Sequence, residues 1–277
     1  MAPQAENKPC NTASSQTQSV YIIRHGDRWD YQHPEWKETA ERKGDPSLST
    51  LGHEQARHVG RYLDKVFVDE DAHADQITLL SSPFLRTVQT SNELLGEIKK
   101  TKGNAVDTVK IKPEYSVFEM DLRGQDYHAS LPEMDERKCY FPRLDENHET
   151  AFVPDLPEDL NKFLSRCDEA MKHISSAYPC EDEKNRVLIV VTHAACCIGL
   201  VKSATGMALQ DINAASPCSI FKLTRKPRDT KWGIDHFSKE GGMNGFTDHM
   251  DDIGTMTRPW NNFGDKKVDN GWTGPPK

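Results

Sequence analysis

The sequence predicts an α/β fold built around a largely parallel sheet. Short apolar runs alternate along the chain with longer stretches in which apolar residues recur at helical spacing, which is the order expected of strands and crossover helices. The strongest apolar run, at 187–191, is typical of a central strand. The chain has 277 residues, of which 36% are hydrophobic and 28% charged, so it can form a sizeable core beneath an ordinary globular surface.

The first predicted elements are a strand at 20–24 and a helix that begins after residue 49. The strand is an apolar run that ends in an arginine. Residues 27–48 are polar and show no clear period, so we interpret them as an insertion. Ser49 is a good N-cap residue. The helix after it has one apolar face, formed by Ala56, Val59, Leu63 and Val66.

A second strand and a second helix follow. Residues 77–80 form a short apolar run, which predicts the strand. Ser82 and Pro83 have the residue types expected of an N-cap and of the first helical turn, and Gly103-Asn104 would end this helix. The predicted buried stripe of the helix consists of Leu85, Val88, Leu95 and Ile98.

The middle of the chain contains a third strand, a long irregular segment and a strong helix. The strand is predicted at 109–112. Residues 121–157 contain four prolines and are too long for a plain loop, so we predict a lid or a substrate-binding insertion. The helix is predicted at 158–178, with Leu160, Phe163, Leu164, Cys167, Met171 and Ile174 on its apolar face.

Two more strands and one helix complete the predicted domain. The strand at 187–191 precedes a helix at 196–203, and the last strand is predicted at 218–223. The domain is therefore predicted to span 19–225, including the two insertions. A single large domain of this kind fits the length of the chain.

The two ends of the chain differ in composition from this domain. Residues 1–18 are rich in Gln, Ser, Thr, Asn and Pro and lack the apolar core of a signal peptide, so we predict a disordered tail. Residues 226–277 form a polar, glycine-rich extension. Part of this extension is predicted to pack on the domain, because it carries the aromatic residues Trp232, Phe237, Phe246, Trp260 and Trp272.

Charge and cysteine content exclude several classes of function. The formal net charge of −8 argues against nucleic acid as the main partner, and no apolar run is long enough to span a bilayer. The seven cysteines are scattered and form no CxxC pair, so neither a disulfide framework nor a zinc site is indicated. We expect reduced thiols and a cytoplasmic location, and a nuclear location is left open.

The tripeptide Arg24-His25-Gly26, at the end of the first strand, has residue types suited to phosphoryl chemistry. Arg24 supplies a permanent charge and a fork of donors for phosphate oxygens. Gly26 allows the backbone to approach a ligand closely. His25 can be neutral near pH 7, with a free lone pair for attack on phosphorus. Taken alone, a histidine that merely hydrogen-bonds a neighbour is the alternative.

Two further arginines stand where they could reach the same anion. Arg28 lies in a turn just after the first strand, although it could equally be a surface arginine paired with Asp27 or Asp30. Arg86 lies in the first turn of the second helix, where anions bind readily, and its alternative is an ordinary surface ion pair.

A second histidine and a carboxylate follow two other predicted strands. His193 closes the strand at 187–191, so it shares the carboxyl edge of the sheet with His25, unless it only caps the next helix. Glu119 follows the third strand and could protonate a leaving group and then activate water. An exposed loop glutamate is the alternative, and Asp121 is a nearby competitor for the role.

The order and spacing of these motifs resemble the histidine phosphatase superfamily, in the branch that includes phosphoglycerate mutases and fructose-2,6-bisphosphatases. The resemblance covers residues from about 20 to 223 and implies a three-layer α/β/α sandwich and a phosphohistidine intermediate. The motifs that carry it are Arg24-His25-Gly26, Leu48-Ser49-x-x-Gly52-x-x-Gln55-Ala56, Ser81-Ser82-Pro83-x-x-Arg86-x-x-x-Thr90 and His193-Ala194.

The resemblance implies a role for each candidate residue. His25 would be the nucleophile, Glu119 the acid and base, and His193 would contribute both to catalysis and to phosphate binding. The other implied phosphate ligands are Arg24, Arg86 and, by resemblance to a subgroup with the motif RHGxR, Arg28. That subgroup includes suppressor phosphatases of T-cell signalling, ecdysteroid-phosphate phosphatase and the phosphatase-like domain of the 55-kDa subunit of transcription factor tau.

The predicted function is therefore hydrolysis of a phosphomonoester without metal or other cofactor. A phosphatase-like scaffold protein is the alternative from another class. A phosphoglycerate-type mutase is less favoured, because mutases carry serine or threonine where Arg28 stands.

The expected partner is a phosphate ester, either a small molecule or a phosphotyrosine protein, and not a nucleic acid or a membrane. A homodimer is left open. Trp29, Tyr31 and Tyr127 could line an apolar pocket for an aromatic or lipophilic ester, or they could be core residues of the insertions.

Overall fold

The central sheet is mostly parallel, as predicted. The computed structural model describes residues 17–121, 131–227, 229, 231–235 and 260–263. Within these residues the strands form one sheet in the order β3-β2-β4-β1-β5-β6. Strands β1 to β4 pair in parallel with one another, whereas β5 and β6 pair antiparallel. The bounds are Gln18–Arg24 (β1), Ile77–Ser81 (β2), Ile111–Pro113 (β3), Val187–Thr192 (β4), Ile220–Arg225 (β5) and Gly233–Ile234 (β6).

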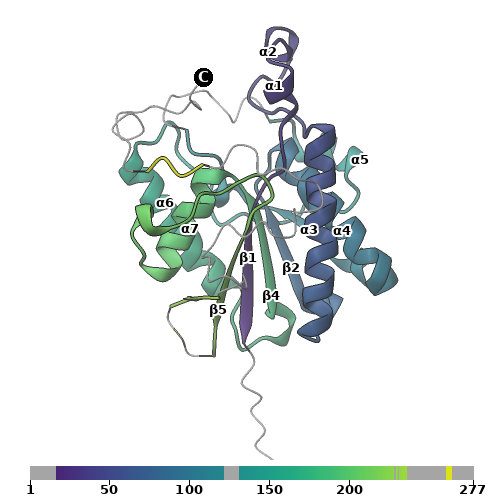
Figure 1. The fold of residues 1–277 in the computed structure, drawn as a ribbon, viewed down its shortest axis with the longest axis vertical. Coiled ribbons are helices and arrows are strands. Elements are labelled where there is room, and N and C mark those ends of the chain that lie inside the picture. Colours follow the sequence, from purple (N-terminus) through teal and green to yellow (C-terminus); the bar gives the residue numbers. More distant parts are fainter. Residues whose placement is uncertain (1–16, 122–130, 228, 230, 236–259, 264–277) are drawn as a thin grey trace, which may run out of the picture.

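Helices cover both faces of this sheet, which gives the expected three-layer α/β/α sandwich. Figure 1 shows α3 (Thr50–Asp69) and α4 (Leu85–Lys102) on one face and α6 (Leu160–Ala177) and α7 (Ala194–Thr205) on the other. The remaining helices are α1 (Trp29–Gln32), α2 (Trp36–Thr39) and α5 (Met134–Tyr140). Short 3-10 turns lie at Ala74–Gln76 (η1), Gly103–Thr108 (η2), Tyr115–Val117 (η3), Glu183–Asn185 (η4) and Leu209–Asp211 (η5).

The sheet separates two apolar cores, and the sequence of its central strands explains both. In β1, Val20 and Ile22 join the core beneath α6 and α7, whereas Tyr21 and Ile23 join the core beneath α3 and α4. Successive side chains of a strand point to opposite faces, so a strand buried on both sides must be apolar at every position. The burial of the whole run 187–191 follows the same rule.

The two predicted helix faces are largely buried as expected. Ser49 caps α3, because its Oγ accepts a hydrogen bond from Gly52 N at 3.0 Å. Of the predicted face of α3, only Val66 is half-buried rather than buried. Helix α6 begins at Leu160 rather than at 158, because Asp159 is its N-cap and accepts from Lys162 N. Helix α7 begins at Ala194, two residues before the predicted start.

The predicted start of the second helix is wrong. Helix α4 begins at Leu85, and the backbone N–H of Leu85 donates to Asp45 Oδ1 at 2.6 Å. A carboxylate forty residues earlier therefore occupies the capping position that the sequence assigns to Ser82. Ser82 Oγ instead lies 2.9 Å from Nε2 of His193. Leu85 is consequently half-buried at the helix end, whereas the rest of its predicted stripe is buried.

The two predicted insertions contain regular structure and contact each other. Residues 27–48 carry the short helices α1 and α2, and the described part of 121–157 carries α5. Asp45, from the first insertion, pairs with Arg137 of α5 at 2.5 Å, and both side chains are buried. Helices of one or two turns are too short to show a helical period of apolar residues in the sequence, and they depend on tertiary contacts for their stability.

The described residues at both chain ends add to the sheet, and those near the C-terminus also add to the core. Strand β1 begins at Gln18, which the sequence placed in the tail, and β6 adds residues 233–234 beyond the predicted domain end. Trp232 and Phe263 are buried in the core beneath α6 and α7, and Trp260 packs against it. The other aromatic residues of the predicted extension, Phe237, Phe246 and Trp272, lie outside the described residues, as do residues 1–16.

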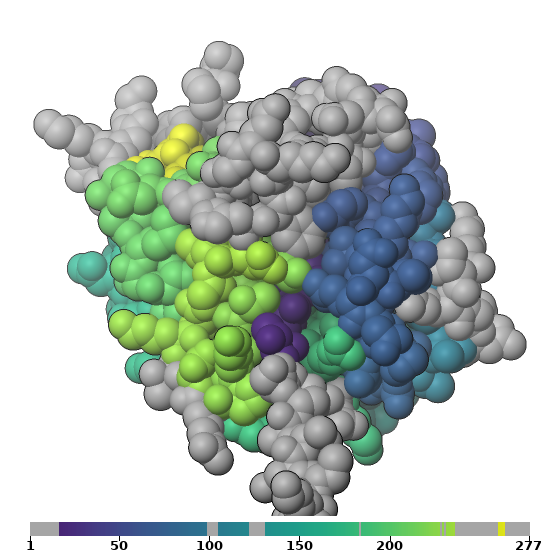
Figure 2. All heavy atoms as spheres, turned by 60° about the horizontal axis from the view of Figure 1, so that its bottom comes forward, coloured from purple at the N-terminus to yellow at the C-terminus, as the bar shows by residue number. Residues whose placement is uncertain are grey.

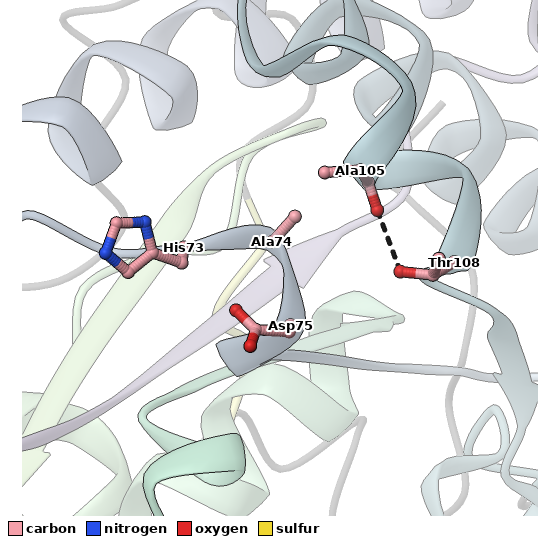
Figure 3. A pocket seen from close by; sticks show the side chains of 5 residues that line it. All are labelled: His73, Ala74, Asp75, Ala105 and Thr108. Atoms are coloured by element: carbon pink, nitrogen blue, oxygen red, sulfur yellow. Dashed lines mark hydrogen bonds between the residues drawn. The ribbon is translucent and has the colours of Figure 1, made fainter.

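The amino ends of the parallel strands β1 to β4 lie on the face opposite α1 and α2, together with the carboxyl end of the antiparallel β5. Figure 2 shows this face, with the start of β1 between β5 and the segment leading into β4, in agreement with their pairing. A cavity of about 430 Å³ lies at this edge, lined by residues that precede β2 and β3 (Figure 3). Among the helices of the described part of the chain, none has the length and hydrophobicity that a bilayer crossing needs.

Candidate active site

The register of β1 and β4 places two histidines side by side at the carboxyl edge of the sheet. Arg24 is opposite Thr192 in the parallel pairing, so His25 and His193 leave the sheet together. The backbone N–H of His25 donates to Thr192 O at 2.9 Å, and the two rings meet edge to face with centroids 5.4 Å apart. The apolar cores that fix the strand register therefore also fix the distance between the histidines.

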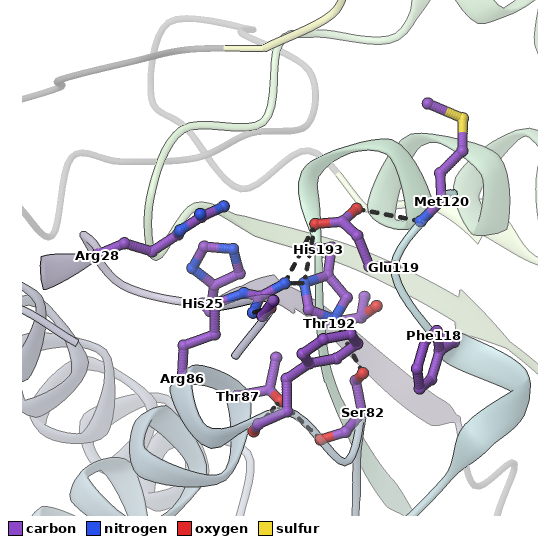
Figure 4. Close-up of polar contacts among 12 residues, drawn as sticks. His25, Arg28, Ser82, Arg86, Thr87, Phe118, Glu119, Met120, Thr192 and His193 are labelled. Carbon is purple, nitrogen blue, oxygen red and sulfur yellow. Dashed lines mark hydrogen bonds and ion pairs between the residues drawn. The ribbon is translucent and has the colours of Figure 1, made fainter. Parts of the chain in front are cut away.

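Arg86 brings a buried positive charge to the two rings. It lies in the first turn of α4, is only 1% exposed, and its guanidinium stands 4.2 Å above the ring of Phe84. Nη2 lies 3.2 Å from Nδ1 of His193 and donates to Glu119 Oε2 at 3.4 Å (Figure 4). Burial weakens solvent screening of this charge, so it acts strongly on its neighbours.

Glu119 is the carboxylate that reaches this cluster. Its Oε2 lies 3.2 Å from Nδ1 of His193, and its Oε1 accepts from the backbone N–H of Met120. Asp121, the competing candidate, uses its backbone carbonyl to accept a hydrogen bond from Glu158 N. The structure thus brings Glu119 together with both Arg86 and His193.

A buried arginine that was not among the predicted site residues holds the segment before Glu119. Nη1 of Arg166 donates to Ser116 O at 2.9 Å and to Phe118 O at 3.1 Å. The other side of its guanidinium pairs with Glu158 in two hydrogen bonds of 2.8 and 2.5 Å. In the sequence, Arg166 could have been noticed because it is a charged residue on the otherwise apolar face of a predicted helix.

Arg28 forms one of the two ion pairs that the sequence left open, the one with Asp30, but within the fold rather than on the surface. It forms a two-bond ion pair with Asp30, at 2.9 and 2.7 Å, and its guanidinium stands 4.6 Å from the ring centroid of Tyr31. It also points toward His25 and the rest of the cluster (Figure 4). The buried carboxylate of Asp30 therefore fixes the direction of Arg28 rather than competing for it on the surface.

Arg24 reaches the same edge from the last position of β1. Its side chain is 4% exposed, and Nη1 donates to the carbonyl of Ala215 at 2.7 Å. Among the described residues, Arg24, Arg28 and Arg86 thus surround His25 with three permanent positive charges, all of which act on the pKa of its ring.

The motif glycines are required by a close backbone crossing. A Cβ on Gly26 would lie 2.5 Å from Gly52 O, and one on Gly52 would lie 2.1 Å from Asp27 O. The crossing is completed by side chains of the same motifs, because Gly26 N donates to Thr90 and Asp27 N to Gln55. These contacts hold the loop that carries His25 against α3 and α4.

His25 is held as a neutral base with one free nitrogen. Its Nδ1 lies 2.7 Å from Gly26 O, and because a carbonyl can only accept, Nδ1 carries the proton and Nε2 keeps its lone pair. Burial lowers the pKa of His25 well below its usual value, and the Arg86 and Arg24 guanidiniums lower it further. The ring is therefore neutral at physiological pH.

His193 and Glu119 each change the pKa of the other. Burial lowers the pKa of His193 to about 4, with Glu119 opposing that shift and Arg86 adding to it. Burial raises the pKa of Glu119, but the His193 ring, Arg86 and Arg28 lower it more, so the net pKa lies well below its usual value. Without a ligand, the site thus contains a neutral His193 and a charged Glu119.

The low pKa of His193 predicts that the fold loses stability in mild acid. The ring has an ordinary pKa of 6.5 when unfolded and about 4 when folded, so between these values only the unfolded chain binds the proton. The free energy of unfolding should fall as the pH drops through this window, by on the order of 3 kcal/mol from this group. Urea unfolding measured across the window, on the parent and on His193→Gln, checks this. Parallel pH profiles for the two proteins would contradict it.

The charges of the cluster favour an anion over a cation. Ligand atoms of His25, Glu119 and His193 lie within 4.8 Å of one another, a spacing that a metal ion could use. The three surrounding guanidiniums cannot lose their charge, so they repel a cation and attract a phosphate-like anion. The donors present fit a phosphoryl group better than a metal.

The predicted substrate-lining residues have different surroundings. Tyr31 lies against Arg28, and although burial raises the pKa of its phenol, Arg28, Arg24 and Arg86 lower it more. Trp29 stacks on His33, with ring centroids 3.9 Å apart. Tyr127 lies outside the described residues. The phenol of Tyr31 thus lies within the electrostatic influence of the arginine cluster.

Comparison with known proteins identifies the family. The model of the family described as the histidine phosphatase superfamily (branch 1) matches residues 20–237. A structure of ecdysone phosphate phosphatase from Bombix mori, in complex with tungstate, is similar with a TM-score of 0.57 and 20% identity, over 79% of this chain and 92% of that one. Phosphoglycerate mutase from Bacillus anthracis str. Sterne is similar with a TM-score of 0.51 and 15% identity, over 80% and 92%.

These structural similarities show a shared fold, and a comparison with curated proteins finds no match. The family match, in contrast, extends over most of the chain, from β1 to just beyond β6. It includes the strand ends that carry the two histidines and all three arginines. The chain therefore belongs to branch 1 of the histidine phosphatase superfamily.

Proposed function

We propose that this protein is a metal-independent phosphomonoesterase that forms a phosphohistidine on His25. One observation carries the proposal: a buried, neutral His25 has a free Nε2 among the Arg24, Arg28 and Arg86 side chains. A neutral nitrogen nucleophile and fixed positive charges are what attack on a phosphate ester requires. Turnover of p-nitrophenyl phosphate by the purified chain tests the proposal, and a folded chain that hydrolyses no phosphomonoester contradicts it.

In the first step, Nε2 of His25 attacks phosphorus in line with the leaving oxygen. The new N–P bond forms as the P–O bond breaks, and the electron pair of that bond goes to the departing oxygen. The three guanidiniums stabilise the charge on the equatorial oxygens, which is the role that Mg²⁺ has in many phosphoryl-transfer enzymes. Nδ1 of His25 keeps its proton, which the Gly26 carbonyl accepts in a hydrogen bond.

Glu119 is proposed to donate the proton to the leaving oxygen. Its low pKa without ligand depends on its contacts with Arg86 and His193. A bound phosphate ester brings its own negative charge to these partners, so the pKa of Glu119 rises when substrate binds. In the second step the carboxylate removes a proton from water, water attacks phosphorus, and the N–P bond breaks to return neutral His25.

Ser82 is proposed to set the tautomer of His193. Its Oγ lies 2.9 Å from Nε2 of His193, and a hydroxyl that donates there leaves the ring proton on Nδ1. Nδ1 faces Glu119 and Arg86, the side on which the phosphoryl group would bind. His193 then acts as a neutral hydrogen-bond donor to a phosphoryl oxygen.

The substrate is proposed to be an aromatic or lipophilic phosphate ester, small or on a protein. Tyr31 lies against Arg28 and within the field of the arginines, so its ring can contact the group attached to the phosphate. Of the relatives, ecdysone phosphate phosphatase is named for an ester of this kind. The cytoplasmic or nuclear location and the homodimer stay predictions.

Removal of metal ions is expected to leave the activity unchanged. The site contains guanidiniums where a metal enzyme would hold a cation, so millimolar EDTA should alter kcat and KM for p-nitrophenyl phosphate by less than about two-fold. Dialysis against EDTA followed by assay with and without added Zn²⁺ or Mg²⁺ measures this. Activity that disappears and returns only with metal would indicate that His25, Glu119 and His193 hold an ion instead.

A further inference from the structure

The carbonyl of Ala215 connects the phosphate site to a segment near the end of the chain. It accepts a hydrogen bond from Nη1 of Arg24 at 2.7 Å and another from the backbone N–H of Trp260 at 3.1 Å. Ala215 N in turn donates to Trp260 O at 2.9 Å, which makes a two-bond antiparallel bridge. Arg24 and Trp260 therefore share one acceptor, whose position the bridge fixes.

The loop that contains Ala215 also holds the backbone of the proposed nucleophile. Cys218 N lies 3.1 Å from Arg24 O and 3.2 Å from His25 O, and Arg24 N donates to Ser219 O. Cys218 has a φ of +58°, a left-handed conformation that non-glycine residues adopt only when their surroundings hold them there. This loop and β4 thus together hold the backbone at the end of β1.

The segment 260–263 is attached to the domain by polar and apolar contacts. Nδ2 of Asn261 donates to Leu209 O at 3.0 Å and to Ile212 O at 2.5 Å, on the segment that leads to Ala215. Phe263 is 6% exposed, its ring stacks with Phe163, and the Trp260 ring meets it edge on. The segment is therefore bonded both to Ala215 and to the residues that lead to it, and its aromatic rings anchor it to the core.

We propose that residues 260–263 are part of the phosphate-binding apparatus and position Arg24 through Ala215. A guanidinium has many rotamers, and only a fixed acceptor keeps its fork aimed at one site. When the segment is released, the Ala215 loop loses its bridge and Arg24 loses its fixed acceptor. The inference rests on the proposed function only in taking phosphate as the ligand, because the coupling itself needs no turnover.

Asn261→Asp in the full chain tests this positioning role. A carboxylate cannot donate to the two carbonyls and repels them, so the segment should detach from the Ala215 loop. The matched control is Trp232→Phe, which also removes a side-chain hydrogen bond in the C-terminal extension, from Nε1 to Ser175 Oγ at 3.1 Å. Hydrogen exchange at the amides of Arg24 and Cys218, which join the end of β1 to this loop, and the Kd of inorganic phosphate by calorimetry, are measured on both variants and the parent.

In Asn261→Asp we expect faster exchange at both amides and a Kd for phosphate about 3- to 10-fold higher, the usual effect of one lost hydrogen bond. Trp232→Phe should change neither quantity by more than about two-fold. Unchanged exchange, an unchanged Kd, or the same changes in the control would each overturn the inference. If Asn261→Asp does not fold, Asn261→Ala, which adds no charge, is measured against the same control.

The outcomes also separate this inference from the proposed function. A parent chain that binds phosphate and shows the coupling, yet hydrolyses no phosphomonoester, contradicts the proposed function and leaves the inference standing. A parent that hydrolyses esters but whose phosphate Kd does not respond to Asn261→Asp contradicts the inference alone. A parent that neither binds phosphate nor hydrolyses any phosphomonoester contradicts both, whereas one that hydrolyses esters without binding phosphate contradicts the inference alone.

Discussion

Replacing His25 with alanine is expected to abolish phosphomonoester turnover while the fold survives. No other side chain in the described site presents a neutral nitrogen with a free lone pair beside the three guanidiniums, so kcat should fall by about 10³-fold or more. Its loss removes one hydrogen bond to the neighbouring Gly26 and the edge-to-face contact with His193, and the two apolar cores of the sheet remain, so the chain should stay folded. Steady-state kinetics with p-nitrophenyl phosphate and thermal unfolding measure the two effects.

The control for this variant is His58→Ala, which removes a histidine on α3 that faces Glu54 at 3.6 Å. It should retain the parent activity. Brief reaction of the parent with a ³²P-labelled ester, quenched in alkali, should leave label on the protein that acid releases, as expected of phosphohistidine, and His25→Ala should carry none. Retained turnover in a clean preparation of His25→Ala would overturn the mechanism.

The features that can be predicted from the sequence are those that depend on local pattern. The apolar runs at β1 and β4 are readable because both faces of each strand are buried, and a residue that follows such a run must lie at the edge of the sheet. The residue pattern alone therefore places His25 and His193 together. Arg86 is placed near them for the same reason, because it follows the carboxyl end of β2 by only five residues.

The features that could not be predicted depend on partners far away in the sequence. Asp45 caps α4 across forty residues and pairs with Arg137 across ninety-two, so no local pattern reveals its role. The same holds for Ser82, whose Ser-Pro context suggests a cap, whereas its hydroxyl contacts His193. Ala215 contributes only its backbone carbonyl to Arg24, and a backbone contact leaves no signature in residue type.

The choice between Glu119 and Asp121 also depends on long-range contacts. Both follow β3 within a few residues, and spacing alone cannot decide which carboxylate turns toward the histidines. Arg166 decides it, because it binds the carbonyls of Ser116 and Phe118 and so fixes the backbone just before Glu119.

Glu119→Gln is expected to impair hydrolysis more strongly for esters whose leaving group is more basic. Glutamine keeps the size of the side chain but cannot supply the proton, and general acid catalysis contributes typically about 10²- to 10⁴-fold. For phenyl phosphate, whose phenolate is strongly basic, kcat/KM should fall by about that factor. For p-nitrophenyl phosphate, whose nitrophenolate leaves readily without a proton, the loss should be at least about ten-fold smaller. The ratio of kcat/KM for the two esters is the measurement.

Asp121→Asn is the matched control, because it removes the competing carboxylate two residues away. Whatever that change costs through packing, it should affect the two esters equally and leave their ratio at the parent value. A ratio that changes in Asp121→Asn rather than in Glu119→Gln would transfer the acid role to Asp121. An equal loss on both esters in Glu119→Gln would mean that the carboxylate acts only through its charge on Arg86 and His193, and proton donation would then have to come from another group or from water.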